Sequence, residues 1–215
     1  MKTVAIYNYK GGVGKTTLAA HLAFRAEAQG ISTVAVSLNR YGDLVPWLAR
    51  ENRPMQDVPH VEHRGHLTII HSPDAVPEVP DTALVVYDCP PALDVALRLK
   101  ADLVLFPTNL SPMHLSPLGT HLPELARSCG SVQFVPWMAR LRGDGDVAAL
   151  RDVAGQFPNV KVWDHVVPDS PAINRANDGL RSVWDSPPDA DSPGAQELAR
   201  LCDGIIALLD PRPVH

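Results

Sequence analysis

Short apolar segments bounded by turn residues alternate along the chain with longer segments of helical period. The predicted strands cover residues 3–8, 33–38, 67–71, 83–88, 103–107, 132–137 and 160–163. This alternation is typical of repeated strand–helix units. It predicts an α/β fold that is doubly wound, with a mostly parallel sheet and helices on both faces.

Two long segments have the spacing of amphipathic helices. Leu18, Leu22 and Ala26 repeat every four residues within residues 15–29, and Gly30 follows as a C-terminal stop. Residues 195–209 form the second segment, and its predicted core side carries Leu198, Leu201, Ile205 and Leu208. We expect the first helix to follow the first strand directly and the second helix to close the fold.

Composition narrows the class of protein. With 215 residues and 45% hydrophobic content, the chain fits one domain over residues 1–215. The net charge of -5 argues against a protein that coats nucleic acid, although it leaves room for a local basic face. The chain starts in a strand and has no window of membrane-spanning length, so we expect a cytoplasmic protein. Three widely spaced cysteines, Cys89, Cys129 and Cys202, predict buried free thiols.

The segment YKGGVGKTT, residues 9–17, lies between the first predicted strand and the first predicted helix. Its glycines let backbone N–H groups turn around phosphate oxygens, and the start of the helix adds its dipole. The residues expected to hold the nucleotide are Gly11, Gly12, Val13, Gly14, Lys15, Thr16 and Thr17. We expect Lys15 to neutralise the β and γ phosphates, Thr16 to bind Mg²⁺ and Thr17 to reach the α-phosphate. The pattern predicts ATP and Mg²⁺ as ligands.

A lysine precedes the paired glycines, and the resulting pattern K-G-G-x-G-K-T, starting at Lys10, resembles the deviant Walker motif of the ParA/MinD family of ATPases. In that family the extra lysine reaches the nucleotide of the other subunit across a two-fold interface. The resemblance therefore implies a catalytic role for Lys10 in an ATP-sandwich homodimer. The alternative is that Lys10 is a solvated loop charge.

Other segments match the family in order. ALVVYDCPP, residues 83–91, resembles the Walker B element, which implies that Asp88 holds Mg²⁺ through water. ADLVLFPTNLSP, residues 101–112, resembles the next strand and its loop on the nucleotide side. VVPDSPAINRANDGLRSVWD, residues 166–185, resembles the short ParA-type partition proteins, which lack an N-terminal DNA-binding domain. By this analogy Pro168 and Asp169 border the adenine.

The turn SLNRYGD, residues 37–43, departs from the family pattern D-x-D-P-Q. Ser37 takes the place of the first acid and Asn39 the place of the second, which orients or activates the attacking water. An amide hydrogen-bonds water but cannot accept its proton, so we expect retained ATP binding with slow hydrolysis. Asp43 is the alternative acid, although we expect it to lie beyond the phosphate region and to cap a helix over residues 44–50. Asn39 fits either a naturally slow switch or an aspartate changed to trap the ATP-bound dimer.

Three further sets of residues have competing interpretations. The histidine cluster at positions 60, 63, 66 and 71 predicts a solvated linker rather than a metal site, and Trp47, Trp137, Trp163 and Trp184 predict packing rather than base stacking. In the family, basic residues near the C-terminus bind DNA phosphates without reading bases, which implies such a role for Arg140, Arg142, Arg175 and Arg181. Scattered solvated charges are the alternative for these arginines.

The resemblance implies a ParA-type partition ATPase associated with the nucleoid. Its ATP-dependent dimer would bind nonspecific DNA, and a ParB-like adaptor or a cargo protein would stimulate hydrolysis. One rival is a MinD-like membrane-positioning switch, for which residues 210–215 offer no basic amphipathic tail. A second rival is a module that holds nucleotide without cleaving it, and Asn39 supports this hypothesis.

Overall fold

The structure is a computed structural model and describes residues 1–40, 43–51, 59–108, 118–139 and 145–211. Its centre is one sheet with the strand order β3-β4-β2-β5-β1-β6-β7-β8, and β9 pairs with β7. The strands are β1 (Lys2–Ile6), β2 (Thr33–Ser37), β3 (His60–Arg64), β4 (Leu67–His71), β5 (Leu84–Asp88), β6 (Leu103–Thr108), β7 (Ser131–Ala139), β8 (Val160–Val162) and β9 (Val167–Pro168). All pairings are parallel except β3 with β4.

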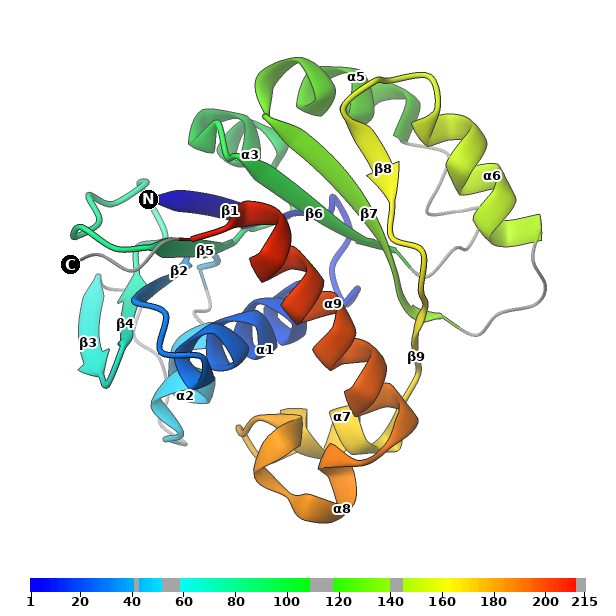
Figure 1. Ribbon diagram of the computed structural model, residues 1–215. Coiled ribbons are helices and arrows are strands. Elements are labelled where there is room, and N and C mark those ends of the chain that lie inside the picture. The colour runs from blue at the N-terminus through cyan, green and yellow to red at the C-terminus, as the bar shows by residue number, and fades with distance from the viewer. Residues whose placement is uncertain (41–42, 52–58, 109–117, 140–144, 212–215) are drawn as a thin grey trace.

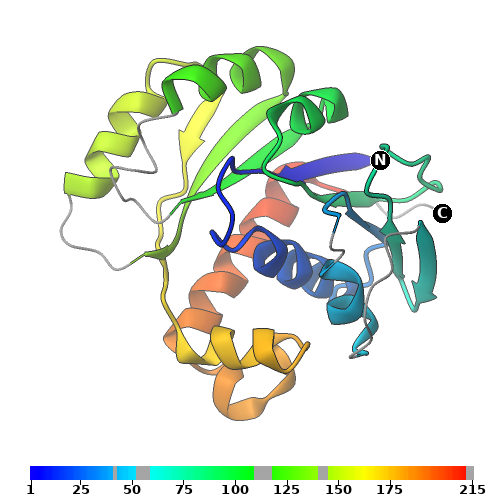
Figure 2. The same cartoon turned by 180° about the vertical axis from the view of Figure 1, so that it is seen from behind.

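Helices cover both faces of the sheet (Figures 1 and 2). One face carries α1 (Lys15–Ala28), α2 (Leu44–Ala49) and α9 (Pro193–Leu209), and the other carries α3 (Leu93–Leu99), α5 (Leu118–Ser128) and α6 (Gly145–Ala154). A small C-terminal lobe, residues 171–190, contains α7 (Pro171–Asp178), the 3-10 helix η1 (Val183–Asp185) and α8 (Pro187–Ala190). The predicted doubly wound α/β fold with a mostly parallel sheet is confirmed.

Strand residues alternate between two buried clusters, one on each face. Val4 and Ile6 of β1 pack with Leu18 and Leu22 of α1, whereas Ala5 packs on the opposite side of the sheet. Strands that are buried on both faces need near-continuous apolar residues, which explains why the sequence pattern locates them well. The predicted first and last helices are confirmed with shifts of one or two residues at their ends. The expected core position of Leu208 is wrong, because its side chain is 61% exposed and the neighbouring Leu209 is buried instead.

The histidine segment is not a linker, and that prediction is wrong. His60 to Arg64 form an antiparallel edge strand that pairs with β4, joined by a turn in which Gly65 has φ 53°. His60 lies opposite His71 in this register, and the His63 Nδ1 and Thr68 Oγ1 atoms are 3.0 Å apart. The alternating exposure of β3 is the period-two signal that the polar composition of the segment concealed.

Core packing accounts for the tryptophans and cysteines. Trp47 and Trp137 are buried, and Trp163 and Trp184 pack against the same core cluster, as predicted. All three cysteines are buried free thiols, as expected. Among the described residues no helix is both long and apolar enough to cross a membrane.

Candidate nucleotide-binding site

The predicted site residues converge at the carboxyl ends of the central strands. The glycine-rich loop joins β1 to α1, Asp88 ends β5, and β2 ends at Ser37. In the sheet register Asp88 lies beside Ile6 on one side and beside Ser37 on the other. The crevice outside the carboxyl ends of parallel strands is where open α/β sheets bind ligands.

The loop has the backbone conformation that its glycines make possible. Gly12 has φ 71° and Gly14 has φ 84°, and Gly14 is the N-cap of α1. A Cβ atom added at Gly14 would lie 2.0 Å from the Trp137 Nε1 atom, so the indole of β7 packs directly on the loop. Both the left-handed backbone and this close contact require glycine at position 14.

Asn8 fixes the start of the loop, a role that the sequence analysis missed. Its Nδ2 atom donates to the Pro107 carbonyl at the end of β6 at 2.8 Å, and its Oδ1 atom accepts from the Lys10 backbone N–H at 2.9 Å. Asn8 is fully buried, so these bonds satisfy its amide away from water. The loop is thereby tied to the neighbouring strand before its glycines begin.

Lys15 and Thr16 lie at the first turn of α1, as predicted. The Lys15 Nζ atom donates to the Lys10 carbonyl at 2.8 Å, so the ammonium group lies over the loop. Lys15 is only 8% exposed, and this burial lowers the pKa of its ammonium group. The Thr16 Oγ1 atom donates to the Asp88 Oδ2 atom at 2.8 Å. Thr16 and Asp88, both predicted to serve Mg²⁺, are therefore in direct contact.

Asp88 is a buried acid with incomplete pairing. Burial raises its pKa to about 7, while the Thr16 hydrogen bond and the Lys15 charge act in the opposite direction. Its Oδ1 atom is buried and has no hydrogen-bond partner within the described parts of the chain. A hydroxyl oxygen next to a carboxylate with a free oxygen is a hard donor set that fits hydrated Mg²⁺. When bound, Mg²⁺ supplies positive charge that stabilises the phosphate oxygens.

Asn39 lies two residues beyond the end of β2 at the same edge of the sheet. The preceding residue, Leu38, donates its N–H to the Asp88 carbonyl at 3.0 Å, which brings this turn next to the magnesium-site acid. Asn39 is half-buried. The structure thus places Asn39 one residue from a backbone bond to Asp88, while its proposed part in hydrolysis stays a prediction.

Asp43 differs from expectation in its capping role. It is the N-cap residue of α2, but its side chain makes no capping hydrogen bond. Its negative charge also contributes to the raised pKa of Asp88, so the carboxylate lies within electrostatic reach of the site. That the chain has left the phosphate region at Asp43 stays a prediction.

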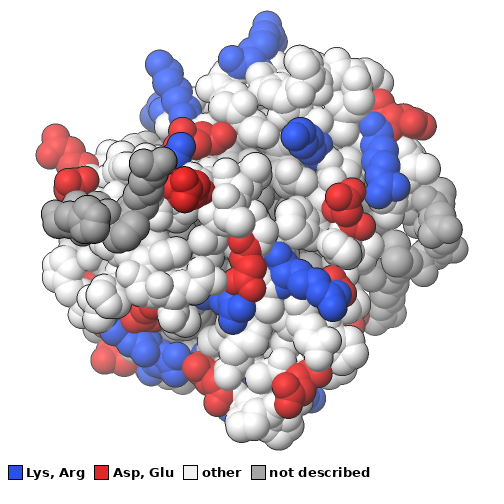
Figure 3. Space-filling view, in the orientation of Figure 1, with Lys and Arg blue, Asp and Glu red and all other residues white. Residues whose placement is uncertain are grey.

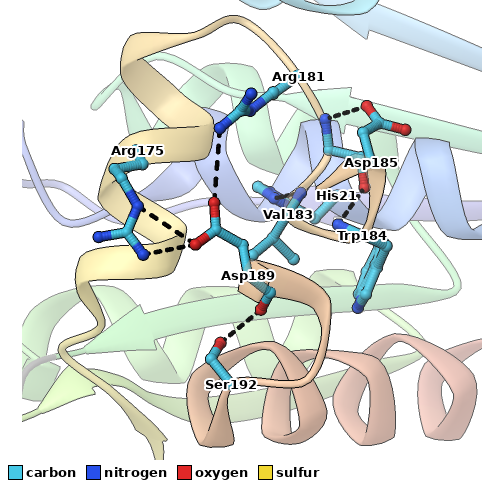
Figure 4. A network of polar contacts seen from close by, with 9 residues as sticks. His21, Arg175, Arg181, Val183, Trp184, Asp185, Asp189 and Ser192 are labelled. Carbon is cyan, nitrogen blue, oxygen red and sulfur yellow. Dashed lines mark hydrogen bonds and ion pairs between the residues drawn. The ribbon is translucent and has the colours of Figure 1, made fainter. Parts of the chain in front are cut away.

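The C-terminal lobe contacts α1 just behind the phosphate loop. The Asn177 Nδ2 atom of α7 lies 3.4 Å from the Thr17 Oγ1 atom. The buried His21 ring of α1 donates from Nδ1 to the Thr17 carbonyl. Its Nε2 atom accepts the Val183 N–H (Figure 4). Burial lowers the pKa of His21 to about 4, so the ring is neutral and holds both bonds. The sequence analysis assigned His21 no role, because both bonds depend on how the chain folds around α1.

Two of the predicted DNA-binding arginines share one acid. Arg175 and Arg181 approach Asp189 from two sides, with contacts of 2.5 Å and 3.5 Å to its two carboxylate oxygens (Figure 4). Asp189 is 3% exposed, and the Arg175 hydrogen bond lowers the pKa of its carboxyl. Both arginine side chains remain partly exposed, at 58% and 40%. The other two predicted positions, Arg140 and Arg142, lie outside the described residues.

Pro168 is the last residue of the short strand β9, and Asp169 follows it. Pro168 lies beside Ala139 in the register with β7, and its neighbour Val167 lies beside Trp137, the residue that packs on Gly14. The Asn174 Nδ2 atom lies 3.4 Å from the Asp169 Oδ1 atom. These residues therefore lie on the β7 side of the loop, and their contact with adenine stays a prediction.

The fold and the loop define a P-loop nucleotide-binding protein, and comparison with known proteins gives its family. Residues 4–183 match the CobQ/CobB/MinD/ParA nucleotide binding domain, and the chain belongs to this family. The resemblance to ParA and MinD proteins is thereby confirmed. MinD is among the ATPases of the family.

Relatives and solved structures agree with this assignment. The Maintenance of carboxysome distribution protein A of Halothiobacillus neapolitanus is 29% identical over 117 residues, 53% of this chain and 53% of that protein. The chain thus aligns with about half the length of this relative. MinD of Pyrococcus horikoshii, solved with Mg-ADP, has a TM-score of 0.71 at 18% identity and covers 96% of each chain. An McdA variant from Cyanothece, solved with ATP, has a TM-score of 0.70 at 17% identity over 100% of this chain and 98% of its own. At these identities, the two structures show the shared fold.

Asp88 makes stability depend on pH in a defined direction. Its pKa is about 7 in the folded chain and 3.8 in a model peptide, so folding strengthens proton binding. The resulting stabilisation is complete below pH ~4 and is lost as the pH rises through ~7. We expect Asp88→Asn to gain stability relative to the parent between these pH values and to show a constant difference above them. Urea unfolding at a series of pH values in EDTA measures this, with the exposed Asp152→Asn as control. Parallel pH profiles for the parent and Asp88→Asn would contradict the burial argument.

Proposed function

We propose that the chain is a ParA-type positioning ATPase, acting as one domain over residues 1–215, whose ATP-bound form is a homodimer. The observation that carries the proposal is Lys10, directly before Gly11 and Gly12. Just after these glycines, the Lys15 ammonium group binds the Lys10 carbonyl and Thr16 contacts Asp88. A phosphate loop needs one lysine for its own nucleotide. The second lysine is explained when two nucleotide sites face each other across a two-fold axis.

Each residue of the site then has a defined task. Backbone N–H groups from Gly11 to Thr16 surround the phosphates, and Lys15 leaves the Lys10 carbonyl to neutralise the β and γ phosphates. Thr16 and Asp88 hold Mg²⁺, Asp88 through water. Lys10 of each subunit stabilises negative charge at the nucleotide of the other. Thr17 faces the α-phosphate and is positioned by Asn177.

Asn39 limits the chemistry in this proposal. It has the reach to orient the attacking water, but its amide cannot take the proton that a carboxylate would accept. Hydrolysis is therefore slow, and the ATP-bound dimer persists. Asp43 is the acid that could substitute, because its charge already acts on Asp88.

The ATP-bound dimer binds DNA without sequence specificity in this proposal. Lys and Arg side chains are interspersed with Asp and Glu over the described part of the face in Figure 3, which agrees with the net charge of -5. DNA binding therefore depends on a local basic area, for which the partly exposed Arg175 and Arg181, with Arg140 and Arg142, are the candidates. Dimerisation doubles the number of phosphate contacts and couples them to ATP.

The cargo is a DNA segment bound through a ParB-like adaptor, or a protein assembly. The name of the Halothiobacillus relative, which refers to carboxysome distribution, favours a protein assembly. In either case the partner stimulates hydrolysis and releases the dimer from the nucleoid. A non-hydrolysing nucleotide-binding module is the second candidate, and the neutral side chain of Asn39 favours it. A MinD-like membrane-positioning switch is the remaining rival.

Restoring a carboxylate at position 39 tests the catalytic part of the proposal. We expect Asn39→Asp to raise the rate of phosphate release from Mg²⁺-ATP by roughly 10²–10⁴-fold, the range that a positioned acid or base contributes. The parent should accumulate as an ATP dimer, which light scattering follows in the same samples. The matched control is Asp43→Asn, which removes the nearby carboxylate and should leave turnover of the Asn39→Asp variant largely intact.

Three outcomes would contradict this assignment. Equal turnover of the parent and Asn39→Asp would show that position 39 is not the water-positioning site. Loss of parental turnover in Asp43→Asn alone would identify Asp43 as the acid. Absence of turnover in every form, with ATP still bound, would favour the non-hydrolysing module.

Charge removal from the C-terminal lobe tests the DNA proposal. We expect Arg175→Ala with Arg181→Ala to weaken binding of the ATP state to random-sequence duplex DNA. Each lost phosphate contact should also reduce the slope of log affinity against log salt by about 1. Fluorescence anisotropy at several salt concentrations measures both. Arg98→Ala with Arg151→Ala, which removes exposed arginines of α3 and α6, is the control. Equal losses of DNA affinity in both double variants would mean that the C-terminal lobe has no special role in DNA binding. Equal DNA affinity of the parent with and without ATP would contradict the proposal that ATP controls DNA binding.

A further inference from the structure

A row of buried polar side chains extends from the magnesium site into the sheet. Asp88, Ser37 and His71 end three adjacent strands, β5, β2 and β4, and lie side by side in register. They are 1%, 0% and 0% exposed. Neighbouring strands are about 4.8 Å apart, so Ser37 is an immediate neighbour of both Asp88 and His71. The sequence comparison treated Ser37 as a neutral replacement for an acid and assigned it no role.

Ser37 faces the same side of the sheet as the phosphate loop. Side chains alternate along a strand, so residues two positions apart face the same side of the sheet. Ala35, two positions before Ser37 on β2, and Val86, two positions before Asp88 on β5, both belong to the core cluster beneath α1. Asp88 on this same face reaches Thr16 at the start of α1. The Ser37 hydroxyl and the Asp88 carboxylate therefore point into the same space beside the loop.

Asp88 and Ser37 each have a buried oxygen atom that lacks a hydrogen-bond partner among the described residues. Thr16 occupies the Asp88 Oδ2 atom, and the Asp88 Oδ1 atom has no hydrogen-bond partner among the described residues. The Ser37 Oγ atom is also buried and without a partner there. Buried polar atoms in folded proteins are nearly always hydrogen-bonded, and two adjacent exceptions indicate a shared ligand. Since a metal-bound water has two hydrogens to donate, one water can serve both oxygens.

We propose that Ser37 is a positioning residue of the Mg²⁺ site. Its Oγ atom and the Asp88 Oδ1 atom accept the two hydrogens of one water molecule in the coordination shell of the ion, whose oxygen faces Mg²⁺. This rests on the proposed function, because it requires that Mg²⁺-nucleotide binds at the loop. The strand register fixes the spacing of the two acceptors, so Ser37 tightens ion binding without touching the nucleotide.

The alternative is that the Ser37 hydroxyl has a purely structural role. A rotation about its Cα–Cβ bond would direct the hydroxyl toward His71, and the residue would then serve the packing between β2 and β4. The two roles predict different effects of removing the hydroxyl. A structural hydroxyl changes the stability of the protein in EDTA. A hydroxyl that holds metal-bound water changes the Mg²⁺ dependence of nucleotide binding, and its removal leaves stability in EDTA equal or higher, because an unpaired buried oxygen is lost.

The test measures binding of fluorescent mant-ADP to the full chain at a series of Mg²⁺ concentrations and in EDTA, together with urea unfolding in EDTA. ADP makes the measurement independent of turnover. The variants are Ser37→Ala and the nearly isosteric Ser37→Cys, which hydrogen-bonds weakly. Ser131→Ala is the control, because it removes a hydroxyl at the amino end of β7 that contacts the Asn159 carbonyl.

We expect both Ser37 variants to raise the Mg²⁺ concentration for half-maximal binding by roughly 10-fold or more, as for other residues that orient metal ligands. Binding in EDTA should match the parent, and Ser131→Ala should keep the parental Mg²⁺ dependence. An unchanged Mg²⁺ dependence in the Ser37 variants would overturn this inference while leaving the proposed function intact. So would lower stability in EDTA without any change in Mg²⁺ dependence. Failure of the parent to bind mant-ADP under any condition would instead overturn the proposed function and this inference with it.

Discussion

The hydrogen bond between Thr16 and Asp88 is the interaction on which the arrangement of the site depends. It joins the first turn of α1 to the end of β5, and it holds one oxygen of a carboxylate that is almost entirely buried. Burial of this acid is unfavourable without a cation, which is why its pKa is raised to about 7. The site is therefore shaped for a positive charge, and Lys15 alone only partly offsets the cost of burial.

Two groups of residues lie next to the Thr16–Asp88 contact. Toward the edge of the sheet, Ser37 at the end of β2 lies beside Asp88, and the Leu38 N–H just before Asn39 binds the Asp88 carbonyl. Toward the C-terminus, Asn177 and His21 connect the segment around Thr17 to the C-terminal lobe, where Asp189 holds Arg175 and Arg181. Thr17 and the lobe that carries Arg175 and Arg181 thus meet on one helix, α1.

Much of the fold and the loop could be predicted from sequence because their determinants are local. Continuous apolar residues between turn residues locate β1 and β5. The glycine-rich loop, followed by apolar residues every four positions, locates α1. Neither signal requires knowledge of the elements that pack against these segments. β3 was missed because its alternation is carried by polar residues, whose burial depends on pairing with β4. The bonds of Asn8 to Pro107 and of Arg175 to Asp189 depend on tertiary contacts, which no spacing rule encodes. The capping bond expected for Asp43 is absent, because a favourable residue type at the N-cap does not by itself fix the side-chain rotamer.

The central claim is that the carboxyl edge of this sheet binds Mg²⁺-ATP and that binding brings two chains together. Sedimentation of the purified chain with Mg²⁺-ATP, Mg²⁺-ADP and no nucleotide, with bound nucleotide detected in the moving boundary, tests both parts in one measurement. The account predicts one nucleotide per chain and a sedimenting species of twice the chain mass only with ATP. A monomer that binds no nucleotide, or a dimer that forms equally in all three conditions, would contradict it.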